Sequence, residues 1–145
     1  MKFYIVDVFA EAKYQGNQLA VFIPDREISK EEMLKIAKEM HFSETSFILS
    51  DKQPNGGYNV RIFTPDIEVP FAGHPTLGTA HIINEVFEGG KAKKIILNLG
   101  AGPIPVETSA GGIMTMSQNQ PKFGMLVDNP KATADALSIN ADDIR

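Results

Sequence analysis

Short runs of apolar and β-branched residues divide the chain into strand-like segments separated by polar turns. The runs fall at residues 3–9, 19–23, 45–50, 58–64, 93–99, 104–108 and 112–117, and each is typical of a β-strand. The turn signal Asn55-Gly56-Gly57 predicts that the strands on either side of it pair antiparallel. Glycine-rich turns between the last three strands predict a meander.

Residues 29–40 carry the signature of an amphipathic helix. Ser29 and Glu32 form an S-x-x-E capping box, and Ile28 is placed to pack onto Met33 as a hydrophobic staple. The apolar positions repeat at helical spacing along one face, at Met33, Ile36, Ala37 and Met40. The charged opposite face indicates a helix that lies on the surface of a core.

A second helix is predicted over residues 74–87, and its character differs. No Asp, Glu, Lys or Arg occurs from Pro75 to Asn84. A helix that is apolar nearly all round is buried, so we interpret His81 as a core histidine. Glu88-Gly89-Gly90 provides a glycine stop at the C-terminal end. These elements predict an α+β fold in which a mixed or antiparallel sheet wraps around a central buried helix.

The start of this second helix, at Gly73-His74-Pro75, suits the binding of a carboxylate or phosphate. Gly73 allows close approach because it lacks a Cβ, and Pro75 suits the first helical position. The amides of residues 76–78 would then lack intrahelical acceptors at the positive end of the helix dipole. His74 would place an imidazole at the rim of that seat, although a capping role explains the same residue equally well.

Composition and charge narrow the class of protein. The 145 residues suffice for one compact domain, which we place at residues 1–120, followed by a tail at 121–145 with a short helix near 132–137. The net charge of −4 and the lack of a basic run argue against nucleic-acid binding. The first residues do not read as a signal peptide, and no apolar stretch could span a bilayer. We therefore expect a cytoplasmic protein without membrane contact.

Several kinds of chemistry find no support in the sequence. The chain has no cysteine, which excludes disulfides, thiolate metal sites and cysteine nucleophiles. His74 and His81 lie seven residues apart, too far for joint ligation, and no H-E-x-x-H motif occurs, so we expect no metal. Gly100-Ala101-Gly102 does not open a helix, and Gly-x-Ser-x-Gly is absent. Neither a dinucleotide-binding loop nor a nucleophile elbow is therefore indicated.

Glu44 is the leading candidate for catalysis. It lies between the first helix and an apolar strand, with Phe42 and Phe47 close in sequence. Partial desolvation by these rings would suit a carboxylate to proton transfer. A polar residue in a helix-to-strand connection explains Glu44 as well, and spacing alone favours this second interpretation.

Together these residues resemble the PhzF-like family of phenazine-biosynthesis proteins. The segment VDVFAEAKYQGNQLAVF is similar to the family's opening strand, Gly-Asn turn and second strand. The segment IAKEMHFSETSFIL contains F-S-E-T, which carries the family's catalytic glutamate. The segment RIFTPDIEVPFAGHPTLGTAHII resembles the hallmark F-T-P…E…F-[AC]-G-H-x-T-L-G. Two ordered motifs at the expected separation make the resemblance specific, and it spans nearly the whole chain.

The resemblance implies a diaminopimelate-epimerase-like fold, in which two similar domains each wrap a sheet around a central helix. The family's type enzyme isomerises a dihydro-hydroxyanthranilate, a small carboxylate-bearing substrate, without metal or organic cofactor. By motif, Glu44 would be the catalytic proton shuttle, and Ser43, Gly73 and His74 would line the substrate pocket. Asn17 is a weaker candidate for the same pocket.

Two departures from the family pattern refine this interpretation. Amino-acid racemases of this fold use paired cysteines, whereas Ala72 precedes Gly73 here and the chain has no cysteine. A carboxylate mechanism is therefore favoured. Family members are also roughly double this length, as expected for two domains of ordinary size. We expect residues 121–145 to lead toward a second domain that this sequence does not contain.

Three hypotheses about function follow. The first is an isomerase present as its N-terminal half, completed by a complementary second-half chain or by a homo-oligomer. The second is a non-catalytic domain that binds a partner or dimerises through the exposed cleft face. The third is a module that binds anions at the helix start alone.

Overall fold

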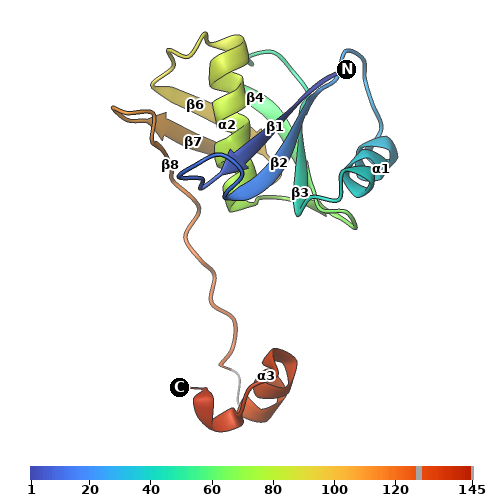
Figure 1. Ribbon diagram of the computed structural model, residues 1–145, viewed down its shortest axis with the longest axis vertical. Helices are drawn as coiled ribbons and strands as arrows, with labels where there is room; N and C mark the ends of the chain where they lie inside the picture. Colours follow the sequence, from blue (N-terminus) through green and yellow to red (C-terminus); the bar gives the residue numbers. More distant parts are fainter. Residues whose placement is uncertain (127–128, 145) are drawn as a thin grey trace.

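A mixed sheet of eight strands forms the middle layer of the molecule, with one helix packed on each face (Figure 1). The computed structural model describes residues 1–126 and 129–144. The elements in chain order are β1 (Lys2–Val8), β2 (Asn17–Ile23), α1 (Lys30–Met40), β3 (Glu44–Ile48), β4 (Gly57–Phe63), β5 (Glu68–Val69), α2 (Gly73–Phe87), β6 (Lys94–Leu99), β7 (Gly102–Thr108), β8 (Met114–Met116), α3 (Pro130–Leu137) and the 3₁₀ turn η1 (Ala141–Asp143). The predicted α+β class is confirmed.

The strands are arranged in the order β1-β2-β3-β4-β6-β7-β8, with β5 paired to β4 off this path. β2 pairs with β3 and β4 pairs with β6 in parallel, whereas the remaining pairs are antiparallel. The expected antiparallel pairing of β3 with β4 and the meander of β6, β7 and β8 are confirmed. β1 and β8 form the two edges of the sheet.

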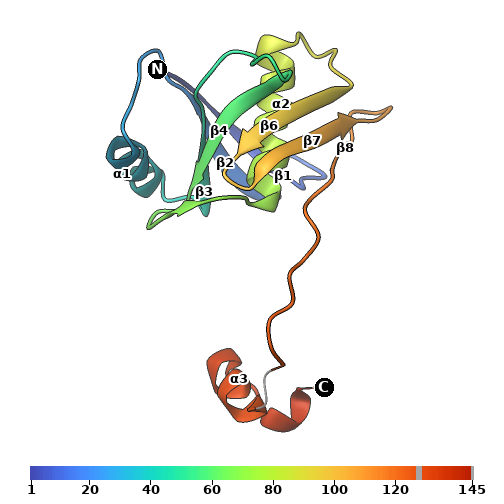
Figure 2. The same ribbon diagram turned by 180° about the vertical axis from the view of Figure 1, so that it is seen from behind.

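Alternating side chains of the sheet supply two separate cores. On β2, Leu19 and Val21 join the larger cluster under α2, whereas Ala20 and Phe22 join a smaller cluster under α1. Successive residues of a strand point to opposite faces, so one apolar run serves both helices. Figure 2 shows β4, β6 and β7 in front of α2, with α1 beside β3 and β4.

Helix α1 begins where the capping box predicts, with Ser29 as its N-cap, although the Glu32 carboxylate pairs with Arg26 and not with the Ser29 amide. The side chain of Ser29 accepts a hydrogen bond of 3.2 Å from the backbone N–H of Glu32. Met33 and Ala37 from the predicted apolar stripe are buried, and they pack in the same cluster as Phe47. This packing fixes the end of α1 just ahead of β3, where Glu44 lies.

Helix α2 contacts strands from both halves of the sheet, namely β1, β2 and β3 on one side and β6 and β8 on the other. Gly78 permits the close approach, because a Cβ there would lie 2.7 Å from Leu19 Cδ2 and 2.8 Å from Val8 Cγ2. The predicted glycine stop is confirmed, since the N–H of Gly90 donates to the carbonyl of Asn84 at 2.8 Å.

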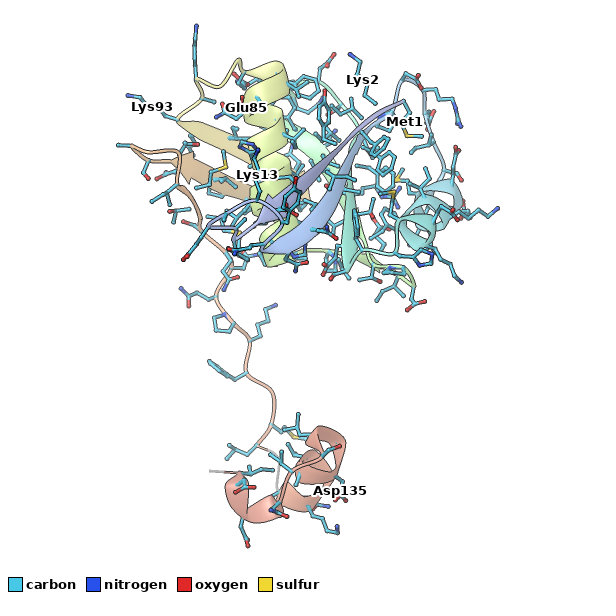
Figure 3. The ribbon with its side chains drawn as sticks, viewed as in Figure 1. Met1, Lys2, Lys13, Glu85, Lys93 and Asp135 are labelled. Atoms are coloured by element: carbon cyan, nitrogen blue, oxygen red, sulfur yellow. The ribbon has the colours of Figure 1, made fainter. Side chains whose placement is uncertain are left out.

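Three details around α2 differ from the sequence prediction. The helix begins at Gly73, so Pro75 occupies its third position and not its first. His81 is exposed and is not a core residue, because the sheet edges β1 and β8 leave one face of α2 uncovered. Glu85, labelled in Figure 3, is exposed one turn further along this face. Strand β5 was not predicted, since two residues are too short for a periodic signal.

The chain beyond β8 leads away from this body. Figures 1 and 2 show residues 117–126 extending away from the sheet. Further along the chain, α3 contacts η1. The predicted tail helix is confirmed, and it begins at Pro130, two residues before the expected start. The side chains of Phe123, Met125 and Leu126 are 92–96% exposed. Within the described ranges, no helix has the length and hydrophobicity needed to cross a bilayer.

Candidate active site

Glu44 and His74 face each other where β3 meets α2. Glu44 is the first residue of β3, and His74 is the second residue of α2. The distance between Glu44 Oε2 and His74 Nε2 is 3.6 Å, and the two side chains are 20% and 8% exposed. This distance exceeds that of a hydrogen bond. Both atoms are buried, and neither has a hydrogen-bond partner within residues 1–126 and 129–144.

Unpartnered atoms of this kind are unusual in a folded protein. Most buried polar side-chain atoms are hydrogen-bonded, and leaving one without a partner costs about 1–3 kcal/mol. Here two such atoms, Glu44 Oε2 on β3 and His74 Nε2 on α2, lie next to each other. Two unsatisfied polar atoms side by side are what a polar ligand bound at this point would satisfy.

Asn17 is the third polar side chain of the site. It is the exposed first residue of β2, and its Nδ2 lies 3.2 Å from His74 Nδ1. The structure therefore brings Asn17, Glu44 and His74 together from three different elements. The contact joins residues 57 positions apart in the sequence, so no local pattern could have revealed it.

The free backbone donors at the start of α2 lie one turn earlier than the sequence prediction placed them. The N–H of Thr76 donates to the carbonyl of Ala72 at 3.3 Å, and the Thr76 hydroxyl donates to the same carbonyl at 2.7 Å. Pro75 has no N–H, so the donors of the first turn without an intrahelical acceptor include those of Gly73 and His74. These free donors therefore belong to His74 itself and to the residue before it.

Ser43 and Gly73 occupy different positions relative to this pair. Gly73 is the first residue of α2, and a Cβ there would meet only Met116 Cε, at 3.6 Å. The backbone of Gly73 is therefore open to a ligand. Ser43 is exposed in the turn before β3, and its side chain makes no hydrogen bond to Glu44 or His74 in the described part of the chain.

A buried hydroxyl pair, which sequence reasoning missed, fixes β3 against α2. Ser46 Oγ and Thr79 Oγ1 lie 2.6 Å apart, and both residues are fully buried. Ser46 is two residues beyond Glu44, and Thr79 is five residues beyond His74. The pair therefore sets the relative position of the two candidate residues. Its only signal in the sequence is a polar residue inside each of two apolar segments.

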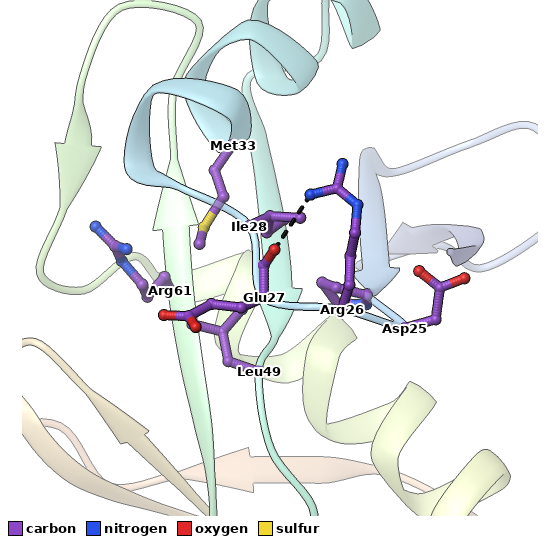
Figure 4. Close-up of a pocket in the computed structure, with 8 residues that line it drawn as sticks. Asp25, Arg26, Glu27, Ile28, Met33, Leu49 and Arg61 are labelled. Carbon is purple, nitrogen blue, oxygen red and sulfur yellow. Dashed lines mark hydrogen bonds between the residues drawn. The ribbon is translucent and has the colours of Figure 1, made fainter.

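A surface pocket of about 510 Å³ lies apart from these residues, between the β2–α1 connection, β3 and β4 (Figure 4). Its lining consists of Pro24, Asp25, Arg26, Glu27, Ile28, Met33, Leu49 and Arg61. Both arginines are already paired, Arg26 with Glu32 and Arg61 with Glu68. Because both arginines are paired with carboxylates and are not free to bind an anion, we place the candidate site at Glu44 and His74.

The chemical groups of the site suit proton transfer beside an anion. A carboxylate can accept a proton and return it, an imidazole can donate a hydrogen bond, and backbone N–H groups at a helix start can hold negative charge. Among residues 1–126 and 129–144, no group of three or more His, Asp or Glu side chains is arranged to hold a metal ion.

A model of the family described as phenazine biosynthesis-like protein, PhzC-PhzF, matches residues 6–144. The chain belongs to the PhzC/PhzF family. One relative in this family, trans-2,3-dihydro-3-hydroxyanthranilate isomerase of Pseudomonas aeruginosa, is 38% identical over 121 residues, which cover 83% of this chain and 42% of the relative. An uncharacterised isomerase of Pasteurella multocida is 32% identical over 142 residues, which cover 98% of this chain and 48% of that protein.

Solved structures are also similar to this chain. A protein of Pseudomonas aeruginosa described as a predicted epimerase superimposes with a TM-score of 0.83 at 31% identity, covering 98% of this chain and 52% of that one. A hydroxyproline epimerase of Agrobacterium vitis, with a TM-score of 0.53 and 15% identity, shares the fold alone. The chain spans about half the length of the PhzC/PhzF relatives that it matches.

Proposed function

We propose that this chain is the N-terminal half of a cofactor-independent isomerase that moves a proton between carbons of a small, carboxylate-bearing substrate. The observation that carries the proposal is the pair of buried, unpartnered atoms, Glu44 Oε2 and His74 Nε2, 3.6 Å apart. The names of the relatives, which are isomerases, support the reaction class.

In the proposed reaction, Glu44 acts as the proton shuttle. Its carboxylate removes a proton from one carbon of the substrate and returns it to another. The N–H groups of Gly73 and His74 hold negative charge on the substrate, and Nε2 of His74 donates to the oxygen on which the intermediate anion is delocalised. The wall formed by α2 and β3 excludes water from Glu44 on one side, since the side chain is only 20% exposed.

The other wall of the cleft would come from outside this sequence. The family relatives are about twice as long, and the likeness to an epimerase supports a diaminopimelate-epimerase-like fold built from two such domains around central helices. In this proposal residues 1–120 form the first domain, and residues 121–145 lead toward the second. A second-half chain or a second copy of this chain would then complete the site.

Exchange of carbon-bound hydrogen with solvent tests the reaction. The substrate named for the Pseudomonas aeruginosa relative, trans-2,3-dihydro-3-hydroxyanthranilate, is incubated in D₂O with this chain and with the second half of that relative as a separate chain. Deuterium incorporation is expected with the two halves together. Replacing Glu44 with Gln should lower the exchange rate by about 10²–10⁴-fold, because the amide cannot carry the proton.

Glu107→Gln provides a matched control for that experiment. Glu107 is an exposed residue of β7 whose carboxylate lies 3.9 Å from Lys94, so its loss should leave exchange unchanged. Full exchange by the Glu44→Gln protein would contradict the proposed role of Glu44. Binding by this chain alone is followed through the backbone amide NMR signals of Gly73 and His74, which should shift when the substrate is added.

A further inference from the structure

The imidazole of His74 is contacted at both ring nitrogens, and the two contacts constrain where its proton lies. Nδ1 is 3.2 Å from Asn17 Nδ2, and Nε2 is 3.6 Å from Glu44 Oε2. The His74 side chain is only 8% exposed. These neighbours, more than bulk water, therefore determine the tautomer of the ring.

The contact with Asn17 indicates which ring nitrogen of His74 accepts a hydrogen bond. An amide nitrogen carries two hydrogens and can only donate a hydrogen bond. Nδ1 of His74 must then accept, which leaves the single proton of the neutral ring on Nε2. Both the Nδ1–H tautomer and the doubly protonated ring would place a second hydrogen against the Asn17 amide hydrogens.

The Glu44 contact on the opposite side of the ring favours a proton on Nε2. If the Asn17 amide were rotated so that its oxygen faced Nδ1, the proton of a neutral ring would lie on Nδ1. The lone pair of Nε2 would then face a carboxylate oxygen 3.6 Å away in a buried site. Two electron-rich atoms repel strongly at that distance where water is excluded. An Nε2–H group directed toward Glu44 is attracted instead.

We infer that Asn17 is a positioning residue that holds His74 as the neutral Nε2–H tautomer, with that N–H directed at the Glu44 side of the site. The consequence for catalysis rests on the function proposed above. His74 would donate a hydrogen bond to an anionic carboxylate or enolate oxygen of the substrate and would not accept a proton. Glu44 would then be the proton carrier that this chain contributes.

The turn before β2 is built to hold Asn17 in place. Gly16 has a φ of +83°, and a Cβ there would lie 2.4 Å from the carbonyl oxygen of Val8. Only glycine fits such a position, because it has no Cβ and favours positive φ. Asn17 follows directly and pairs with Val8 in the β1–β2 register. The Gly16-Asn17 turn thus places the Asn17 amide next to the imidazole of His74.

Nitrogen-15 NMR of the histidine side chains tests the inference on the free chain, without substrate. In the wild-type protein at neutral pH, His74 should show a protonated Nε2 and an unprotonated Nδ1. In Asn17→Asp, the new carboxylate should attract a proton to Nδ1, so the unprotonated Nδ1 signal should be lost. The signals of His41 and His81, which are both exposed, serve as internal references and should not change.

Gln18→Glu is the matched control, because it adds the same negative charge at the next residue of β2, on the opposite face of the strand. It should leave the His74 nitrogen signals as in the wild type. A wild-type His74 protonated on Nδ1, alone or on both nitrogens, would overturn the inference, as would signals unaffected by Asn17→Asp. Failure of the proposed function is a separate result, since it is measured as exchange that persists in Glu44→Gln.

Discussion

At the scale of single residues, Glu68 contacts two basic side chains, and these contacts allow a prediction about acid stability. Its two carboxylate oxygens accept hydrogen bonds of 2.7 Å from Nε and Nη2 of Arg61, and Nζ of Lys30 lies 3.1 Å from Oε2. Mainly through the Arg61 hydrogen bonds, the pKa of Glu68 falls from 4.5 to about 2. The folded state therefore favours the ionised form more than the unfolded chain does.

This lowered pKa makes the contribution of Glu68 depend on pH in a defined direction. The stabilisation is fully present above pH 4.5 and disappears as the pH falls toward 2. Glu68→Gln should therefore lower the free energy of unfolding by about 2 kcal/mol at pH 7. The difference from the wild type should shrink steadily between pH 4.5 and pH 2. Urea titrations at several pH values measure it, and a difference independent of pH would refute the assignment.

The residues of the candidate site could largely be predicted from the sequence, whereas their contacts could not. Glu44 and His74 stand in motifs that a family resemblance can identify. Their distance of 3.6 Å depends on the packing of β3 against α2, which no local pattern encodes. The exposure of His81 likewise depends on which face of α2 the sheet leaves uncovered, and a charge-free sequence predicts burial on every face.

At the scale of secondary-structure elements, the hydroxyl pair of Ser46 and Thr79 connects β3 to α2. Replacing Thr79 with Val keeps the shape of the side chain but leaves the buried Ser46 hydroxyl without its partner. The free energy of unfolding should fall by about 1–3 kcal/mol. In a double-mutant cycle with Ser46→Ala, the second substitution should cost less than it does alone. Additive effects would show that the hydroxyls do not interact.

Gly78 offers a second prediction at this scale, because it sets how closely α2 approaches β1 and β2. Alanine normally improves a helix by about 1 kcal/mol relative to glycine. Here the added methyl would overlap Leu19 Cδ2 and Val8 Cγ2, at 2.7 and 2.8 Å, and overpacking costs about 1–3 kcal/mol. Gly78→Ala should therefore be less stable than the wild type in urea unfolding. His81→Ala, on the exposed face of the same helix, should not be destabilised.

Elements were predicted best where the sequence signal was local. The capping box located the start of α1, and the Glu88-Gly89-Gly90 stop located the end of α2. The proline of the second helix was misplaced by two positions because Ala72, without a side-chain cap, is its N-cap. The parallel pairs β2–β3 and β4–β6 were not predicted, since each joins strands separated by other elements of the chain.

At the scale of the whole molecule, the body and the tail differ in whether their apolar side chains are buried. The body buries its apolar residues in two clusters on opposite faces of one sheet. The tail exposes Phe123, Met125 and Leu126 almost completely. Large exposed apolar side chains on adjacent residues are typical of surfaces that contact a partner. Such a partner fits the proposed second domain, and it fits a second copy of this chain as well.

Removing the tail tests whether it contributes to the stability of the body or to self-association. A chain ending at Gln120 retains every strand and both helices of the body, together with the hydrogen bond from Asn119 to the Ala101 carbonyl. Its urea midpoint should therefore equal that of the full chain, whereas a chain ending before Met114 should be destabilised by the loss of β8. If the tail contacts a second copy, light scattering should show self-association of the full chain that the shortened chain lacks. A lower midpoint for the chain ending at Gln120 would show instead that the tail packs on the body. Monomers of both lengths would rule out self-association through the tail.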